Sequence, residues 1–175
     1  MDAISDRGLK QISWSTVVMF ALGFWLSGSL LLDSVIIPSL SNAGMMAQAG
    51  FASAGYVLFG TFHRIELLCA ALVLTSFLIF RHTHNLSPEK ERWSIILAGL
   101  LLAIPLIYTY ILTPQMSGLG LQLNLFEDSP TTMPEAMIWM HWGYWSLEAI
   151  KFIAGVTLLR WCYRNSCTLT YSNEQ

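Results

Sequence analysis

Seven ionisable residues interrupt stretches of sequence that are otherwise apolar. They are Asp33, His63, Arg64, Glu66, His141, Glu148 and Lys151. Carboxylates and imidazoles can relay protons, a neutral imidazole can ligate a metal, and opposite charges can form buried ion pairs. Residues three or four apart share one face of a helix, so His63 lies with Glu66, and His141 lies with Glu148 and Lys151. The sequence therefore predicts two polar stripes on two helices.

The remaining motifs do not indicate an enzyme. The sequence has no G-x-S-x-G, phosphate-binding loop, zinc-protease helix or C-x-x-C. His82 and His84 form an isolated pair with no cysteine or carboxylate to complete a ligand set, so no metal site is predicted. No basic tail suggests a nucleic-acid partner. We expect a non-catalytic protein.

Composition places the polar stripes inside a membrane. The chain has 175 residues, of which 54% are hydrophobic and only 11% charged, whereas soluble domains are about a quarter charged. Apolar runs reach the roughly 20 residues that a spanning helix needs. The prediction is one membrane domain, 1–175, an all-α bundle of four transmembrane helices in contact with membrane lipid. The spans are expected at about 13–37, 54–80, 93–112 and 136–163.

Basic residues orient these spans. Seven of the nine lysines and arginines lie near the N-terminus, in residues 81–92, or near the C-terminal end of the last span: Arg7, Lys10, Arg81, Lys90, Arg92, Arg160 and Arg164. The connections at 38–53 and 113–135 contain none. The positive-inside rule then predicts that both termini are cytoplasmic, or stromal in a thylakoid. Pro38 and the following stretch SLSNAG are expected to end the first span, and Pro88 to begin the third helix.

The charged residues should face one another. Each would cost about 2.5–3.5 kcal/mol at the centre of a lipid-facing helix. A rise of 1.5 Å per residue puts Glu66 and Glu148 both about 18 Å from the outer ends of their spans. We therefore predict an intramembrane polar layer of all seven residues, with Arg64 paired to Glu148 and Glu66 paired to Lys151. The third span contributes no charged residue to this layer.

Four roles for the layer remain open at this point. It can act as internal ion pairing that fixes helix register, as a proton or ion path, or as a surface for a partner's helix. It can also hold a cofactor, since His63 and His141 are candidate ligands for haem iron or chlorophyll magnesium. Ion pairing is the simplest of the four because it needs no further component. On that basis no cofactor is required.

Two stretches resemble a known family. These are "GFWLSGSLLLDSVIIPSL" and "AGFASAGYVLFGTFHRIELLCAALVLT", and the resemblance runs from about Phe20 to Thr75, about a third of the chain. They resemble small four-helix membrane proteins of cyanobacteria, related to a plastid protein that assists photosystem II assembly and more distantly to a broad four-helix family of unknown function. The resemblance implies a thylakoid membrane factor whose partners are photosystem II subunits or other assembly factors. The alternatives are a small ion or metal transporter and a pigment- or haem-binding module.

Overall fold

The computed structural model of the chain describes residues 14–45, 48, 50–82, 88–125 and 135–172. These residues are helical apart from a short turn after Asn42, and no strand occurs within the described ranges. The helices are α1 (Trp14–Leu31), α2 (Ile37–Asn42), α3 (Phe51–His82), α4 (Pro88–Ile107), α5 (Thr113–Leu125) and α6 (Glu135–Ser172). Two π-helical segments, η1 (Leu32–Ile36) and η3 (Tyr108–Leu112), join α1 to α2 and α4 to α5. The expected all-α class is confirmed.

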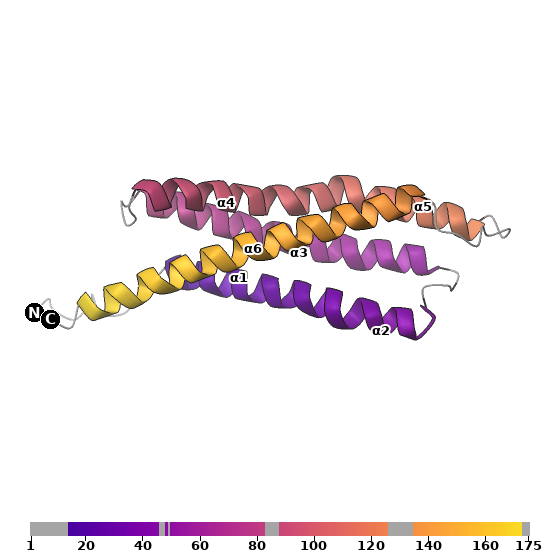
Figure 1. Cartoon of the computed structure of the whole chain (residues 1–175), viewed down its shortest axis with the longest axis horizontal. Coiled ribbons are helices and arrows are strands. Elements are labelled where there is room, and N and C mark those ends of the chain that lie inside the picture. Colours follow the sequence, from indigo (N-terminus) through magenta and orange to yellow (C-terminus); the bar gives the residue numbers. More distant parts are fainter. Residues whose placement is uncertain (1–13, 46–47, 49, 83–87, 126–134, 173–175) are drawn as a thin grey trace, which may run out of the picture.

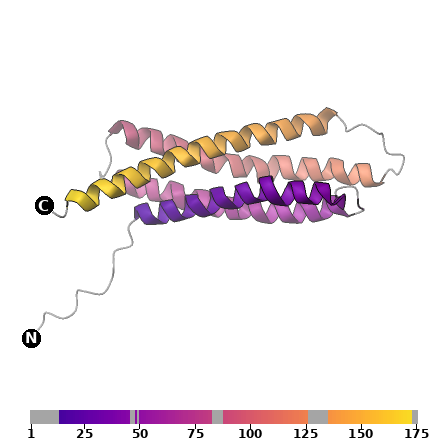
Figure 2. The same ribbon diagram turned by 60° about the horizontal axis from the view of Figure 1, so that its bottom comes forward.

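Helices that neighbour each other run in opposite directions, and the start of α1 lies at the same end as the end of α6 (Figures 1 and 2). Helix α1 packs against α3 and α6, and α4 packs against the same two helices. Within the described residues, the backbones of α1 and α4 do not pack together, and neither do those of α3 and α6. In cross-section the bundle is therefore a square, with α3 and α6 at opposite corners.

The exterior of this bundle is apolar. Three stretches are long and apolar enough to cross a membrane, namely Trp14–Asn42, Ser53–Ile79 and Arg92–Gly120. Large apolar side chains point outward along them, including Phe20 at 77% exposure and Leu68 at 67%. Such a surface is unusual in a soluble monomer and is suited to lipid. The chain is an integral membrane protein; α6 is not among these three stretches.

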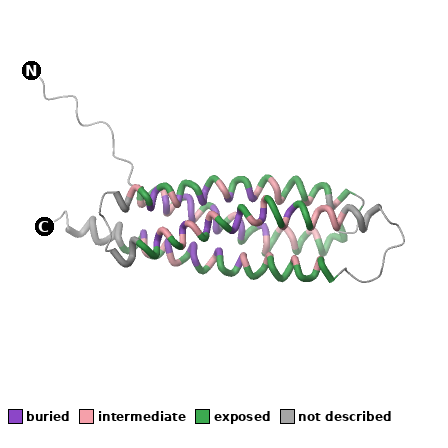
Figure 3. Tube along the Cα trace, turned by 90° about the horizontal axis from the view of Figure 1, so that it is seen from above, coloured by how far each residue is buried: buried purple, intermediate pink, exposed green. Residues whose placement is uncertain are grey.

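The apolar core fills the half of the bundle that contains the start of α1. Buried side chains concentrate there, and exposure increases toward the opposite end, here called the outer end (Figure 3). The core includes Leu22 and Trp25 from α1, Val73 from α3, Leu101 from α4 and Leu158 from α6. At the outer end, α2 packs against no described helix other than the adjoining η1. The bundle is thus closed at one end and looser at the other.

A proline follows each π-helical segment. Pro38 comes two residues after η1, and Pro114 two residues after η3. A proline lacks the N–H donor and crowds the carbonyl four residues earlier. Each widened turn contains a hydrogen bond that reaches five residues back, from the Ile37 N–H to the Leu32 carbonyl and from the Thr113 N–H to the Tyr108 carbonyl. Pro38 does not itself end the helix, which continues to Asn42, within the stretch SLSNAG that was expected to end the first span together with Pro38. Pro88 begins α4 as expected.

Close packing of α1 on α6 depends on Gly155. A Cβ atom added there would lie 2.9 Å from Cδ2 of Leu26 and 3.1 Å from its Cδ1. We predict that Gly155→Val lowers the free energy of unfolding by about 1–3 kcal/mol, since overpacking forces side chains out of their rotamers. Thermal unfolding in detergent would measure this. Gly99→Val is the control, because nothing lies within 4 Å of a Cβ built at Gly99; equal losses in both variants would contradict the prediction.

Candidate functional site

Lys151 lies at the centre of a buried polar network between the four packed helices. Its Nζ is 2.7 Å from Oε1 of Glu66 on α3 and 2.5 Å from Oε1 of Glu148, one turn earlier on α6. All three side chains are nearly inaccessible, at 1–2% exposure. The backbones of α3 and α6 lie at opposite corners of the square and do not pack together. The Lys151 side chain spans this diagonal and joins the two helices.

The Glu66 carboxylate is bonded to four surrounding side chains. Oε1 receives the Trp25 Nε1–H at 2.7 Å, the Ser29 hydroxyl at 3.0 Å and the Lys151 ammonium at 2.7 Å. Lys151 also donates to the Ser29 hydroxyl oxygen at 2.9 Å. Oε2 lies 2.7 Å from Nδ1 of His63, one turn earlier on α3. A carboxylate can only accept, so His63 donates this bond. Glu66 is therefore held in its ionised form by donors from α1, α3 and α6.

Aromatic rings surround the His63 imidazole. Its centroid is 4.8 Å from that of Tyr108, 6.0 Å from that of the stacked Phe59 and 6.2 Å from that of Phe62, which meets it edge-on. His63 is only 2% exposed. The Lys151 ammonium likewise lies 5.7–6.0 Å from three ring centroids, a distance at which ring faces attract a cation. The rings around His63 therefore shield it from solvent. Those around Lys151 stabilise the positive charge of its ammonium group.

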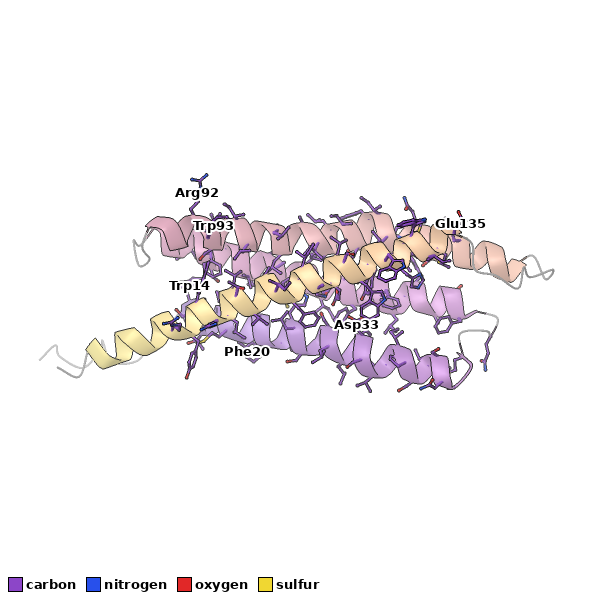
Figure 4. All side chains as sticks on the ribbon, viewed as in Figure 1. Trp14, Phe20, Asp33, Arg92, Trp93 and Glu135 are labelled. Atoms are coloured by element: carbon purple, nitrogen blue, oxygen red, sulfur yellow. The ribbon has the colours of Figure 1, made fainter. Side chains whose placement is uncertain are left out.

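A second part of the network extends toward the outer end. The Tyr108 hydroxyl donates to Oε2 of Glu148 at 2.9 Å, and the Tyr144 hydroxyl donates to Oδ1 of Asp33 at 2.9 Å. Asp33 belongs to η1, and the Tyr144 hydroxyl joins it to α6. Figure 4 labels Asp33 among the side chains of the bundle. Because η1 carries Asp33 and η3 begins with Tyr108, each π-helical segment supplies one member of the network, a placement typical of functional positions.

The structure brings five of the seven predicted layer residues together and corrects two. Asp33, His63, Glu66, Glu148 and Lys151 form the network, and the expected Glu66–Lys151 pair is present. Arg64 is exposed, so the expected Arg64–Glu148 pair is wrong and Lys151 occupies that position instead. The reason is helical geometry, since Arg64 lies about 100° around α3 from His63.

His141 is the second correction. It is exposed, and its Nδ1 lies 2.8 Å from the Met137 carbonyl oxygen of the preceding turn. It lines a hollow of about 360 Å³ with Ile138, Trp142 and Trp145, none of which surrounds His63. The two histidines therefore have no common site, and joint ligation of one metal does not fit this geometry. Among the residues that the structure describes, no group of three His, Cys, Asp or Glu could hold a metal ion.

Sequence reasoning missed three members of the network. Trp25, Ser29 and Tyr108 are each at most 2% exposed and each binds a charged partner. The prediction counted only charged side chains on the third span, and so it missed the Tyr108 hydroxyl. A usable signal was present: Trp25 and Ser29 lie four residues apart, hence on one face of their helix, and both carry a donor inside an apolar run.

Comparison of the chain with protein-family models, with curated proteins and with solved structures finds no match. What the network does must therefore be argued from its own geometry. Most of its donors and acceptors are paired with one another, although Oδ2 of Asp33 has no hydrogen-bond partner among the described residues. Its centre is an ammonium group between two carboxyl groups, an arrangement suited to holding helices in register.

Removing the Lys151 charge should be severely destabilising, because it leaves two buried carboxyl groups without their cation. We predict that Lys151→Met lowers the free energy of unfolding by about 3–5 kcal/mol. Denaturant unfolding of the detergent-solubilised protein would measure the loss. The double variant Lys151→Met/Glu66→Gln should recover part of it. Arg64→Met is the matched control, since Arg64 is a basic residue of the same bundle that is exposed; an equal loss in that control would contradict the prediction.

Proposed function

We propose that this protein is a non-catalytic auxiliary factor of the thylakoid membrane that helps to assemble a membrane complex, photosystem II. The resemblance of residues 20–75 to assembly proteins of that complex supports the proposal. The geometry supports a binding role over a chemical one, because the buried ionisable groups are engaged with one another. In this proposal α6 is the fourth span, and both termini face the cytoplasm or stroma, as the basic residues indicate.

The exposed position of Arg64 is the observation that carries a partner-binding role. Arg64 lies near the middle of the apolar stretch Ser53–Ile79. Its exposed neighbours on α3 include two large apolar side chains, Val57 at 65% exposure and Leu68 at 67%. A guanidinium group at this depth costs about 2.5–3.5 kcal/mol when it faces lipid alone. A carboxylate on the transmembrane helix of a partner would remove that cost and fix the register of docking.

Capture from native membranes tests this function. We predict that the tagged protein co-purifies with photosystem II subunits and that Arg64→Leu reduces their recovery at least about tenfold, the factor that corresponds to 1.4 kcal/mol. Arg64→Lys should retain part of the recovery, because it keeps the charge but not the bidentate geometry. Quantitative mass spectrometry of the eluate is the measurement.

Arg92→Leu is the control for that experiment, because Arg92 projects from the bundle near its end, at the start of α4, away from the middle of α3 (Figure 4). It should leave recovery unchanged. If the unaltered protein captures no photosystem II subunit, the assembly function is wrong. If Arg64→Leu captures as much as the unaltered protein, the partner does not dock on this face and the arginine reaches lipid phosphate instead.

A second candidate function is suggested by His141. A carbonyl only accepts, so the bond to Met137 places the imidazole hydrogen on Nδ1 and leaves the Nε2 lone pair available to a metal. Trp142 and Trp145 beside it are 66% and 53% exposed. An apolar hollow with one imidazole suits a metal-centred tetrapyrrole such as chlorophyll or haem. His63 does not suit one, because aromatic rings enclose it.

This second function has its own test. If His141 holds a tetrapyrrole, the protein purified from native membranes should show the absorbance of that pigment, and His141→Leu should abolish it while leaving helix content and yield unchanged. The His141 imidazole is exposed and bonds only to its own helix, so this variant should fold. Absence of pigment absorbance from the unaltered protein would eliminate the function.

A further inference from the structure

Four buried ionisable side chains form a continuous row through the centre of the bundle. In order of contact they are His63, Glu66, Lys151 and Glu148. Nδ1 of His63 is 2.7 Å from Oε2 of Glu66. Nζ of Lys151 is 2.7 Å from Oε1 of Glu66 and 2.5 Å from Oε1 of Glu148. Each of the four residues is at most 2% exposed. The row is closed to solvent, so its total charge decides how costly it is to bury.

Both carboxyl groups of this row act as acceptors. Four donors bind the two oxygens of Glu66. At Glu148, the Lys151 ammonium contacts Oε1 and the Tyr108 hydroxyl donates to Oε2. An ionised carboxylate only accepts, so these donors fit two carboxylates. Among the described residues, Lys151 supplies the one ammonium group that contacts them. With a neutral His63, the row would therefore contain one uncompensated negative charge.

We propose that His63 binds a second proton and supplies the missing positive charge. Nδ1 already donates to Glu66, so the second proton lies on Nε2. Signs then alternate along the row, and each charge contacts only charges of the opposite sign. The two cations do not compete for Glu66, because they bind different oxygens of its carboxylate. An isolated buried charge is so costly that such groups normally change their protonation instead. His63 is thus the proton-binding site of the network.

The groups around His63 favour a cation. Glu66 on the same helix is an anion, and the Tyr108 ring on η3 lies 4.8 Å away, within the distance at which rings attract a cation. On α6, the Lys151 ammonium is separated from His63 by the Glu66 carboxylate. Helix α1 contributes two uncharged donors, which bind Glu66. Asp33 on η1 is half-buried and accepts from a tyrosine of α6, so it stands outside the row.

The proton makes the junction of α3 with α6 dependent on pH. These two helices are joined by the ion pair of Glu66 with Lys151, and His63 shares the same carboxylate. In an unfolded chain, a histidine is neutral above its ordinary pKa of about 6.5. The folded bundle keeps the proton at such a pH, so it binds more protons than the unfolded chain. Stability is therefore expected to fall as the pH rises.

Nitrogen NMR of the protein with isotope-labelled histidine, in lipid nanodiscs, tests the site directly. At about one pH unit above the ordinary histidine pKa of about 6.5, His63 should show two protonated ring nitrogens. The exposed His141 should show one bare nitrogen under the same conditions. The His63 signals are identified by their loss in His63→Gln or by through-space contact with the Tyr108 ring. A bare nitrogen on His63 would overturn the proposal and would leave a carboxyl group as the holder of any proton.

Glu148→Gln separates the charge balance of the row from local pairing. This variant removes the carboxylate at the far end of the row and leaves the Glu66 partner of His63 in place. Lys151 and Glu66 then balance each other, so His63 should become neutral and show one bare nitrogen. Glu135→Gln is the control, since Glu135 is an exposed acid at the start of α6; there His63 should keep both protons. If His63 also keeps both protons in Glu148→Gln, the proposal is wrong.

Thermal unfolding in the same nanodiscs gives an independent measurement. The melting temperature of the unaltered protein should decline from neutral to alkaline pH. His63→Gln should show a flatter dependence, because it lacks the group that loses the proton, whereas Glu135→Gln should decline as the unaltered protein does. An equal decline in His63→Gln and the unaltered protein would contradict the assignment. If His63→Gln does not fold, the NMR signals of the unaltered protein and of Glu148→Gln decide the question.

Discussion

The ion pairs of Lys151 are the interaction on which the rest of the structure depends. Four helices arranged as a square contact only their neighbours, and apolar packing in a membrane gains little over contact with lipid. Lys151 joins α3 and α6, whose backbones lie at opposite corners of the square, through its ion pairs with Glu66 on α3 and Glu148 on α6. Ser29 and Trp25 tie α1 to the same carboxylate, and Tyr108 ties η3 to Glu148. Helices α1, α3 and α6, together with η3 at the end of α4, thus all contribute side chains to one buried polar network.

The π-helical segments make that convergence possible. An α-helix presents a residue every 100°, and a register set by apolar packing at one end fixes the faces at the other. One extra residue in a turn rotates everything beyond it. Here the widened turns occur at Leu32–Ile36 and Tyr108–Leu112, each just before a proline, at the level where the apolar core gives way to polar contacts. The prolines therefore stabilise the local geometry that brings Asp33 and the Tyr108 hydroxyl to the network.

Part of this arrangement was predictable from the sequence, and the limits are physical. Composition and apolar run length indicate a helical membrane protein, and the cost of buried charge predicts that Glu66 meets Lys151. Depth alone cannot say which charged residue faces inward. Arg64 and Glu66 lie at similar depth, yet only the rotation of α3 decides that one is exposed and the other buried. Pro38 and the residues after it were expected to end the first span, whereas the helix widens before Pro38, continues through it and ends at Asn42.

The spacing of the charged residues has a consequence for how such a chain enters a bilayer. His63 and Glu66 lie three residues apart on α3, and Glu148 and Lys151 lie three residues apart on α6. Each helix therefore carries its own partner for its own acid, one turn away, before any other helix is present. A helix whose acid already has a hydrogen-bonding partner passes from the translocation machinery into lipid at lower cost than one with an isolated charge. Local pairing during synthesis and cross-helix pairing after assembly use the same side chains, so the intermediate and the finished bundle do not compete.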